Sequence, residues 1–77
     1  MQEAYENLAN AIIQQAVKDY RKALLYLYRH PESWAYRESA REIENFFRSE
    51  WICMLTELDG IWIMDKVRNA VKWEVSA

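Results

Sequence analysis

One histidine and one cysteine are the residues of this chain best suited to covalent chemistry. His30 directly precedes Pro31, so a turn is expected there. Cys53 has no second histidine available to activate it as a thiolate. The sequence therefore predicts no catalytic residue. It also excludes an intrachain disulfide and any His/Cys zinc site of the usual kind.

The sequence also argues against a metal site and a phosphate-binding loop. Glu38 and Glu42 share a helix face at i, i+4, but they have arginine neighbours and no histidine or aspartate to complete a metal site. The chain has a single glycine, so it has no glycine-rich loop to cradle a phosphate. We expect no metal, no cofactor and no enzymatic activity.

Aromatic and cationic residues recur at helical spacing and are more informative. One face of the last expected helix carries residues at i, i+4, i+7 and i+11, namely Trp62, Lys66, Asn69 and Trp73. A tryptophan ring buries on the order of 150–250 Å² when it is covered. Two such rings on the outer face of one helix predict an intermolecular contact. Self-association and binding of another protein are both open.

A second set lies on the outer side of the expected second helix. Trp34, Arg37 and Arg41 combine an indole with two cations, and Arg48 follows on the same side. Glu44 is expected to pair with Arg48 at i, i+4. This set is a further candidate for protein binding. Its composition also resembles that of sites for single-stranded nucleic acid. A third set surrounds Leu25 with the cations Lys18, Lys22 and Arg29.

The elements that position these residues are predicted to be helices. One side of the first helix carries an apolar stripe. The helix is expected to end near Arg29, because Pro31 removes a donor and biases His30 out of helical dihedrals. The stripe consists of Tyr5, Leu8, Ala9, Ile12, Ile13, Ala16, Tyr20, Ala23, Leu24 and Leu27. The second helix is expected from about Glu32 to Arg48. Its inner face is Tyr36, Ala40, Ile43, Phe46 and Phe47.

A short third helix is expected after Ser49, which is a good N-cap. Its expected inward residues are Trp51, Met54, Leu55 and Leu58. Asp59 and Gly60 then interrupt the helix, since glycine tolerates left-handed dihedrals and aspartate caps the start of the next helix. The last helix is predicted from about Ile61 to Glu74. Its residues expected to face the core are Met64, Val67 and Val71, with Ile63 and Ala70 beside them.

Length and composition limit the architecture. The 77 residues are 52% hydrophobic and include one glycine and one proline. A chain of this size forms one core of marginal stability unless its packing is dense or a second subunit covers it. We predict an all-α protein. It is a single domain over residues 1–77, a compact bundle of four helices with a long first helix and a short third one.

Charge and targeting features bear on the partner and the location. A net charge of −2 argues against a protein that binds nucleic acid mainly by neutralising phosphates. The lone thiol favours a reducing compartment. The first residues lack a signal peptide, and no apolar run reaches the ~20 residues that span a bilayer. We expect a cytoplasmic protein with no membrane partner.

Four segments of the chain resemble a group of small helical proteins from phages, prophages and conjugative elements of Gram-positive bacteria. They are residues 5–13 (YENLANAII), 16–24 (AVKDYRKAL), 46–51 (FFRSEW) and 55–60 (LTELDG). The resemblance implies a mobile-element protein that acts inside a bacterial cell, and it supplies no activity. Between residues 25 and 36 and after Gly60, this chain carries aromatic residues where that group has more lysine and glutamate. We interpret these departures as a new aromatic surface for a host target.

The favoured hypothesis is a non-catalytic phage or mobile-element protein that binds and inhibits a host protein or ribonucleoprotein complex. A CRISPR effector is one such target, which would make the chain an anti-CRISPR protein. In this hypothesis Trp62 and Trp73 are apolar anchors, while Lys66 and the arginines supply charge pairing. Two alternatives stay open: a small DNA-binding regulator of phage or plasmid genes, and an accessory protein that acts as a homodimer or larger homo-oligomer.

Overall fold

Helix α1 runs without interruption over Gln2–Arg29, because no glycine or proline lies within it. It is followed by α2 (Trp34–Arg48), α3 (Glu50–Leu55) and α4 (Gly60–Ser76). The structure, a computed structural model, describes residues 2–76 and their side chains from Ala4 onward. No strand occurs within that range. The predicted all-α architecture is therefore confirmed, with a long first helix and a short third one.

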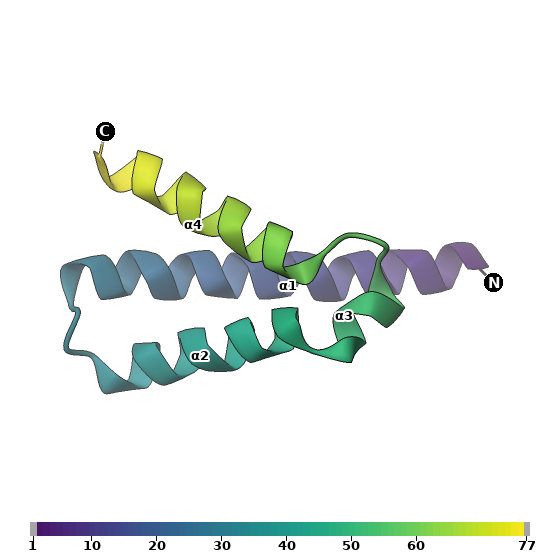
Figure 1. Cartoon of the computed structure of the whole chain (residues 1–77), viewed down its shortest axis with the longest axis horizontal. Coiled ribbons are helices and arrows are strands. Elements are labelled where there is room, and N and C mark those ends of the chain that lie inside the picture. The colour runs from purple at the N-terminus through teal and green to yellow at the C-terminus, as the bar shows by residue number, and fades with distance from the viewer. Residues whose placement is uncertain (1, 77) are drawn as a thin grey trace.

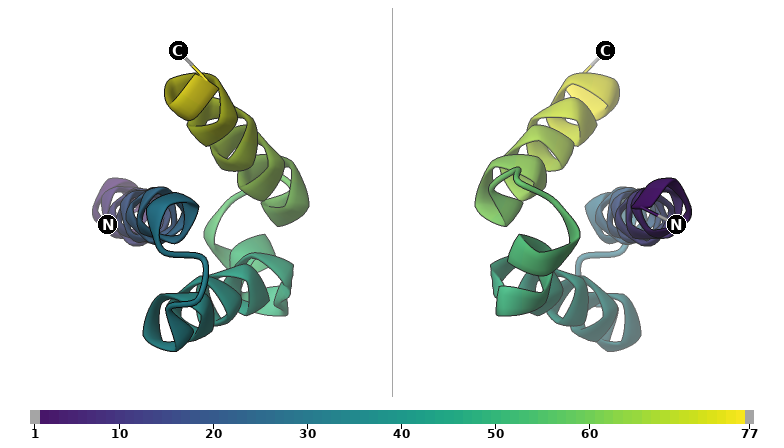
Figure 2. Two further views of the ribbon diagram at one scale, coloured as in Figure 1. Left: turned by 90° about the vertical axis from the view of Figure 1, so that its left-hand side faces the viewer. Right: turned by 90° about the vertical axis from the view of Figure 1, so that its right-hand side faces the viewer.

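α1 is the spine of the bundle, which measures 43 × 26 × 18 Å. α2 and α4 pack against α1 and lie on opposite sides of it in Figure 1, while α3 lies beside its N-terminal half. The view along the long axis places α1, α2 and α4 at the corners of a triangle (Figure 2). The three long helices thus enclose the core, and each has one face directed away from it. No helix of the described chain is both long enough and apolar enough to cross a bilayer.

The turn between α1 and α2 forms at Pro31, as predicted, but α2 begins later than expected. The His30 N–H closes the last turn of α1 on the Tyr26 carbonyl at 2.9 Å. Ser33 then acts as the N-cap of α2, and its hydroxyl accepts a long hydrogen bond from the Tyr36 N–H at 3.5 Å. α2 therefore begins at Trp34 and not at about Glu32, because the capping residue has extended dihedrals.

Ser49 occupies the N-cap position of α3 without making the expected side-chain cap. Its hydroxyl and its N–H both donate to the Phe46 carbonyl, at 2.6 and 3.1 Å. The side chain therefore closes the end of α2 instead of the start of α3. The two helices follow each other so closely that one residue serves both termini, and the carbonyl of α2 is the nearer partner.

Gly60 is required for a reason other than the expected one. It is the first residue of α4, and it does not have a positive φ. A Cβ atom at this position would lie 1.9 Å from the Phe47 carbonyl oxygen, so glycine permits a close approach of two backbones. The expected cap is confirmed, since an Asp59 carboxylate oxygen accepts a hydrogen bond from the Ile61 N–H at 3.0 Å.

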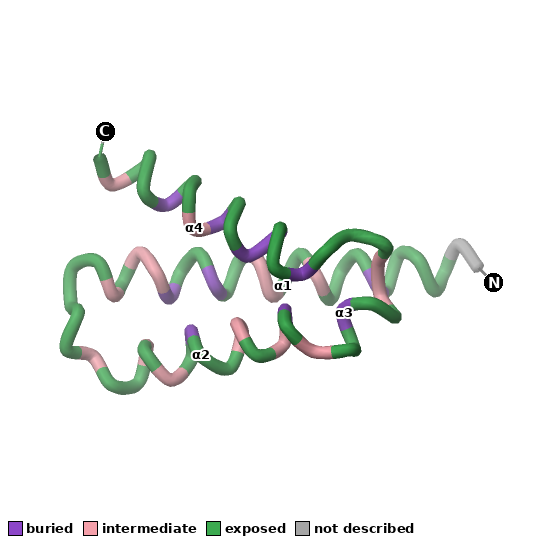
Figure 3. Tube along the Cα trace, viewed as in Figure 1, coloured by how far each residue is buried: buried purple, intermediate pink, exposed green. Residues whose placement is uncertain are grey.

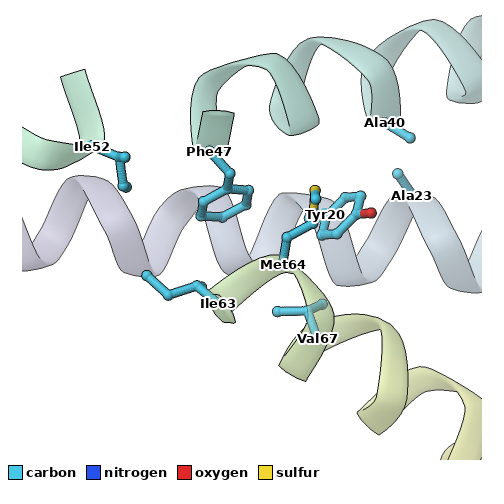
Figure 4. Packing of buried hydrophobic residues seen from close by; sticks show 8 residues of the cluster. All are labelled: Tyr20, Ala23, Ala40, Phe47, Ile52, Ile63, Met64 and Val67. Atoms are coloured by element: carbon cyan, nitrogen blue, oxygen red, sulfur yellow. The ribbon is translucent and has the colours of Figure 1, made fainter. Parts of the chain in front are cut away.

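The core lies where α1, α2 and α4 meet, and three of its side chains are fully enclosed: Tyr20, Phe47 and Met64. Figure 4 shows them pointing toward one another from three different helices. The rings of Tyr20 and Phe47 have centroids 6.0 Å apart in a tilted arrangement. From α4 the buried residues are Gly60, Ile63, Met64, Val67 and Val71, which confirms the predicted inner face except for Ala70. Ala70 is exposed.

A polar network ties the same three helices together. The Tyr20 hydroxyl donates to a Glu44 carboxylate oxygen at 2.7 Å, and Arg68 donates to both groups at 2.8 and 2.9 Å. Burial, and then the hydrogen bond to Glu44, raises the pKa of Tyr20 to about 12. Burial acts to raise the pKa of Glu44 too, but the hydrogen bonds from Tyr20 and Arg68 outweigh it and hold that pKa below 4.5. The expected Glu44–Arg48 ion pair is not formed, because Arg68 of α4 takes its place.

The orientation predicted for α3 is wrong. Ile52 is its buried residue, whereas Trp51, Met54 and Leu58 are 65%, 65% and 54% exposed. Leu55 is half-buried. A six-residue helix has less than two turns, so its own apolar pattern is too short to fix its rotation. The short connections to α2 and α4 fix it instead, and they turn Ile52 toward Gly60.

The apolar stripe of α1 is covered along only part of its length. Ala9, Tyr20 and Ala23 are buried, but Tyr5, Leu8 and Ile12 remain exposed. Figure 3 shows the same gradient, with mostly exposed residues along the N-terminal part of the tube. α2 and α4 pack mainly against the middle and C-terminal parts of α1, so the stripe extends beyond its covering helices.

Candidate interaction surface

The outer face of α4 presents the two tryptophans as the sequence predicted. Trp62 is 51% exposed and Trp73 is 78% exposed. Between them the Lys66 ammonium lies 5.3 Å from the centroid of the Trp62 ring, within reach of a cation–π contact. The face is held outward because the opposite side of α4 is packed in the core. The structure therefore brings Trp62, Lys66, Asn69 and Trp73 together on one side of one helix.

This face borders a groove between α4 and α1. The groove has a volume of about 830 Å³ and is lined by apolar side chains of both helices, including Leu24, Leu27, Val71 and Val75. Arg68 and Lys72 add cations to the lining. A smaller hollow of about 220 Å³ beneath Trp73 is lined by Asn69, Lys72 and Ser76, and all three also line the groove. Trp73 thus lies at the rim of a concave apolar surface, the form that binding sites commonly take.

An ion pair also joins α1 to the C-terminal part of α4. Arg21 of α1 donates to both carboxylate oxygens of Glu74 at 2.6 and 2.7 Å. Beside this pair lies a second hollow of about 570 Å³, whose lining includes Lys22, Leu25 and Arg29. Two of the three cations predicted around Leu25, Lys22 and Arg29, therefore border the C-terminal end of α4, and Lys18 does not. The C-terminal halves of α1 and α4 form a predominantly basic region.

The second predicted set does not join the α4 face. Trp34 is 73% exposed, but α2 and α4 lie on different sides of α1 (Figure 1). Arg37 donates to the Pro31 carbonyl at 2.7 Å, and Arg41 lies 3.6 Å from a Glu38 carboxylate oxygen. These contacts use part of the hydrogen-bonding capacity of both arginines within the chain. Protein binding by Trp34, Arg37 and Arg41 stays a prediction for a separate surface.

The two residues considered for covalent chemistry lie on the surface. His30 is exposed, and its ring centroid lies 4.7 Å from that of Tyr26, which in turn stacks on Tyr36 at 3.9 Å. Cys53 is an exposed thiol on α3. Among the described residues, no group of three histidine, cysteine, aspartate or glutamate side chains is arranged to hold a metal ion.

A further surface, at the N-terminal half of α1, was not predicted from the sequence. Leu8 and Ile12 are 61% and 40% exposed there, and Ile12 lines a mostly apolar hollow of about 330 Å³ against Phe46 of α2. The Tyr5 hydroxyl donates to the Met54 carbonyl at 3.0 Å, which fastens the first turns of α1 to α3. One sequence signal could have revealed this surface: residues 7–17, NLANAIIQQAV, contain no charged side chain. Surface helices normally carry charges, so such a gap is informative.

Comparison of the chain with models of known protein families, with curated proteins and with solved structures found no match.

Proposed function

We propose that this protein acts without catalysis, by binding another protein through the outer face of α4. The observation that carries the proposal is the position of Trp73, which is 78% exposed at the rim of a groove of about 830 Å³. Tryptophan, tyrosine and arginine are the residue types that contribute most at interface hot spots. A helix packed along its inner side presents such an anchor with little loss of conformational entropy on binding.

The charges around this face support an acidic partner surface. Lys66 and Lys72 lie on α4 itself, and Lys22 and Arg29 of α1 lie near its C-terminal end. The carboxylates of α4 are engaged within the chain, Glu74 by Arg21 and Asp65 by Arg68. Complementary charge steers association and selects partners, while the apolar anchors supply affinity. The partner that fits is a protein with carboxylates around an apolar pocket or ridge.

The resemblance to small mobile-element proteins supports a further step, that binding inhibits a host protein or ribonucleoprotein complex such as a CRISPR effector. The mechanism is occlusion, in which the α4 face covers a surface that the complex needs for its own partner. Action in the cytoplasm of a bacterial host belongs to the same proposal.

The experiment is capture of partners from a bacterial host extract on the immobilised wild-type chain, followed by purification of the captured protein and measurement of its affinity. Trp73→Ala is expected to weaken that affinity by about 10- to 30-fold or more, as hot-spot truncations do. The same variant is expected to lose any inhibition of the captured complex. Equal affinity of Trp73→Ala and wild type would overturn the assignment of the α4 face.

Trp51→Ala is the matched control, because Trp51 is also an exposed tryptophan but lies on α3. It is expected to bind the partner as wild type does. A salt titration separates the alternative of nucleic-acid binding, since contacts to phosphates lose affinity steeply as salt rises. An apolar anchor with a few flanking charges gives a shallow dependence.

A further inference from the structure

The uncharged surface of α1 has the features of a contact between two copies of this chain. Along it, Ala4, Leu8, Ala11 and Gln15 follow one another at spacings of four, three and four residues. All four are exposed. This is the spacing of a seam along which two helices pack side by side. Ala9 lies on the other side of α1, buried in the bundle, so the seam and the bundle use different faces of the helix.

The absence of charge favours a second copy of the chain as the occupant. In a two-fold symmetric contact, each residue of a patch meets the same patch on the partner, so any net charge is repelled by its own copy. Residues 7–17 carry no charged side chain, which removes that repulsion. Depletion of charge is also a feature of an interface core. The basic region around α4 lacks this property, since it would meet its own cations.

The surface area supports the same occupant. The chain exposes 6092 Å² for a mass of 9.3 kDa, whereas folded monomers of that mass expose about 5,000 Å². The excess of about 1,000 Å² is close to the ~800 Å² that each partner buries in an interface of standard size. Part of it lies on the N-terminal half of α1, where Leu8 and Ile12 are exposed (Figure 3).

We infer that the protein forms a two-fold homodimer through antiparallel packing of α1 against the partner's α1, centred near Ala11. The small side chain of Ala11 meets the partner's Ala11 and lets the helices approach closely. Leu8 packs beside the partner's Gln15, and Ile12 lies at the edge of the seam. The hydrogen bond from Tyr5 to α3 holds the start of the seam in place. The inference is independent of the proposed function, because it uses a different helix.

Sedimentation equilibrium of the whole chain tests the dimer first. The expected mass is twice 9.3 kDa when the chain concentration is about 100 µM. This concentration exceeds the micromolar Kd of the weakest interfaces of standard size. A mass of 9.3 kDa at that concentration would overturn the inference.

Ala11→Glu tests the location of the interface. It would set two carboxylates against each other at the centre of the dimer, and we expect the dimer Kd to rise by at least about 30-fold. Glutamate is a good helix former and the site is exposed, so the helical content should stay that of wild type. Asn10→Glu is the matched control, since Asn10 is exposed one residue away but lies off the seam. It should remain dimeric.

Mixing charge variants tests the symmetry. Ala11→Glu and Ala11→Lys should each be monomeric alone and should form a dimer when mixed, because opposite charges then face each other across the two-fold axis. A mixture that stays monomeric would contradict the contact of Ala11 with its own copy. If Ala11→Glu stays dimeric while Trp62→Ala/Trp73→Ala becomes monomeric, the dimer forms through α4 and the inference is wrong.

Discussion

The outer face of α4 and the exposed N-terminal half of α1 are both apolar, but they differ in charge and in the kind of side chain. The α4 face combines two indoles with Lys66 and borders a mainly apolar groove whose charged lining residues are Asp65, Arg68 and Lys72. The α1 surface combines small and aliphatic side chains with amides and has no charge between residues 7 and 17. A charged surface is complementary to something unlike itself, whereas an uncharged one is able to meet its own copy.

The two regions also differ in how they are held. The α4 face depends on core packing behind it, through Met64 and Val67, and on the network around Arg68. The N-terminal half of α1 projects past most of the bundle and is fastened mainly by α3. Mutations in the core that the helices share should affect both regions, and mutations behind one region should affect mainly that region.

The largest expected effect comes from Gly60→Ala, at the point where the start of α4 approaches the end of α2. In most helices a change from glycine to alanine stabilises by up to about 1 kcal/mol. Here the added methyl group would overlap the Phe47 carbonyl, so we expect the free energy of unfolding to fall by about 1–3 kcal/mol or more. Denaturant titration measures this. Ala70→Gly on the exposed side of α4 is the control for helix propensity, and an increase in stability for Gly60→Ala would contradict the close approach.

A middle effect is expected from the Tyr20–Glu44–Arg68 network, which joins α1, α2 and α4 behind the α4 face. Tyr20→Phe removes a donor to Glu44 and an acceptor for Arg68, and should cost about 1–3 kcal/mol at neutral pH. Because the pKa of Tyr20 is about 12 in the folded chain and 10.0 unperturbed, its contribution is complete below pH 10 and is lost as the pH rises toward 12.

The pKa of Glu44 has the opposite consequence. It lies below 4.5 in the folded chain, so its contribution is present above that pH and is lost in more acidic solution. Thermal unfolding across pH measures both limits. Tyr20→Phe should reduce the alkaline loss, and Glu44→Gln should reduce the acidic loss. A Tyr20→Phe variant with the same alkaline decline as wild type would refute this account of the network.

The smallest effect is expected from Arg21→Gln, which tests whether the two regions are independent. The Arg21–Glu74 pair is half-exposed, so its loss should cost only about 0.2–1 kcal/mol. Faster amide exchange should be confined to the last turns of α4, with the N-terminal half of α1 unchanged. Glu74→Gln is the matched variant, and the double variant should be no less stable than either single one. Faster exchange along residues 4–17 would show that the two regions are coupled.

Much of the local structure could be predicted from residue types. The turn at Pro31, the cap at Asp59 and the inner residues of α4 follow from proline geometry, side-chain capping and a 3.6-residue period over several turns. The exposure of Trp62 and Trp73 follows from the same period, since the inner face of a long helix determines its outer face. The rotation of α3 could not be predicted in this way, because its six residues do not complete two turns.

The sequence by itself determined that the chain is helical, where its long helices end and which side of each long helix is apolar, because these properties depend on neighbours within about one turn. The tertiary structure decided how far each apolar side is covered. It buried Tyr20, left Leu8 exposed on the same stripe, and paired Glu44 with Arg68 of α4 in place of the nearby Arg48. Coverage and pairing depend on distances between residues far apart in the chain, and those distances are set only when the helices pack.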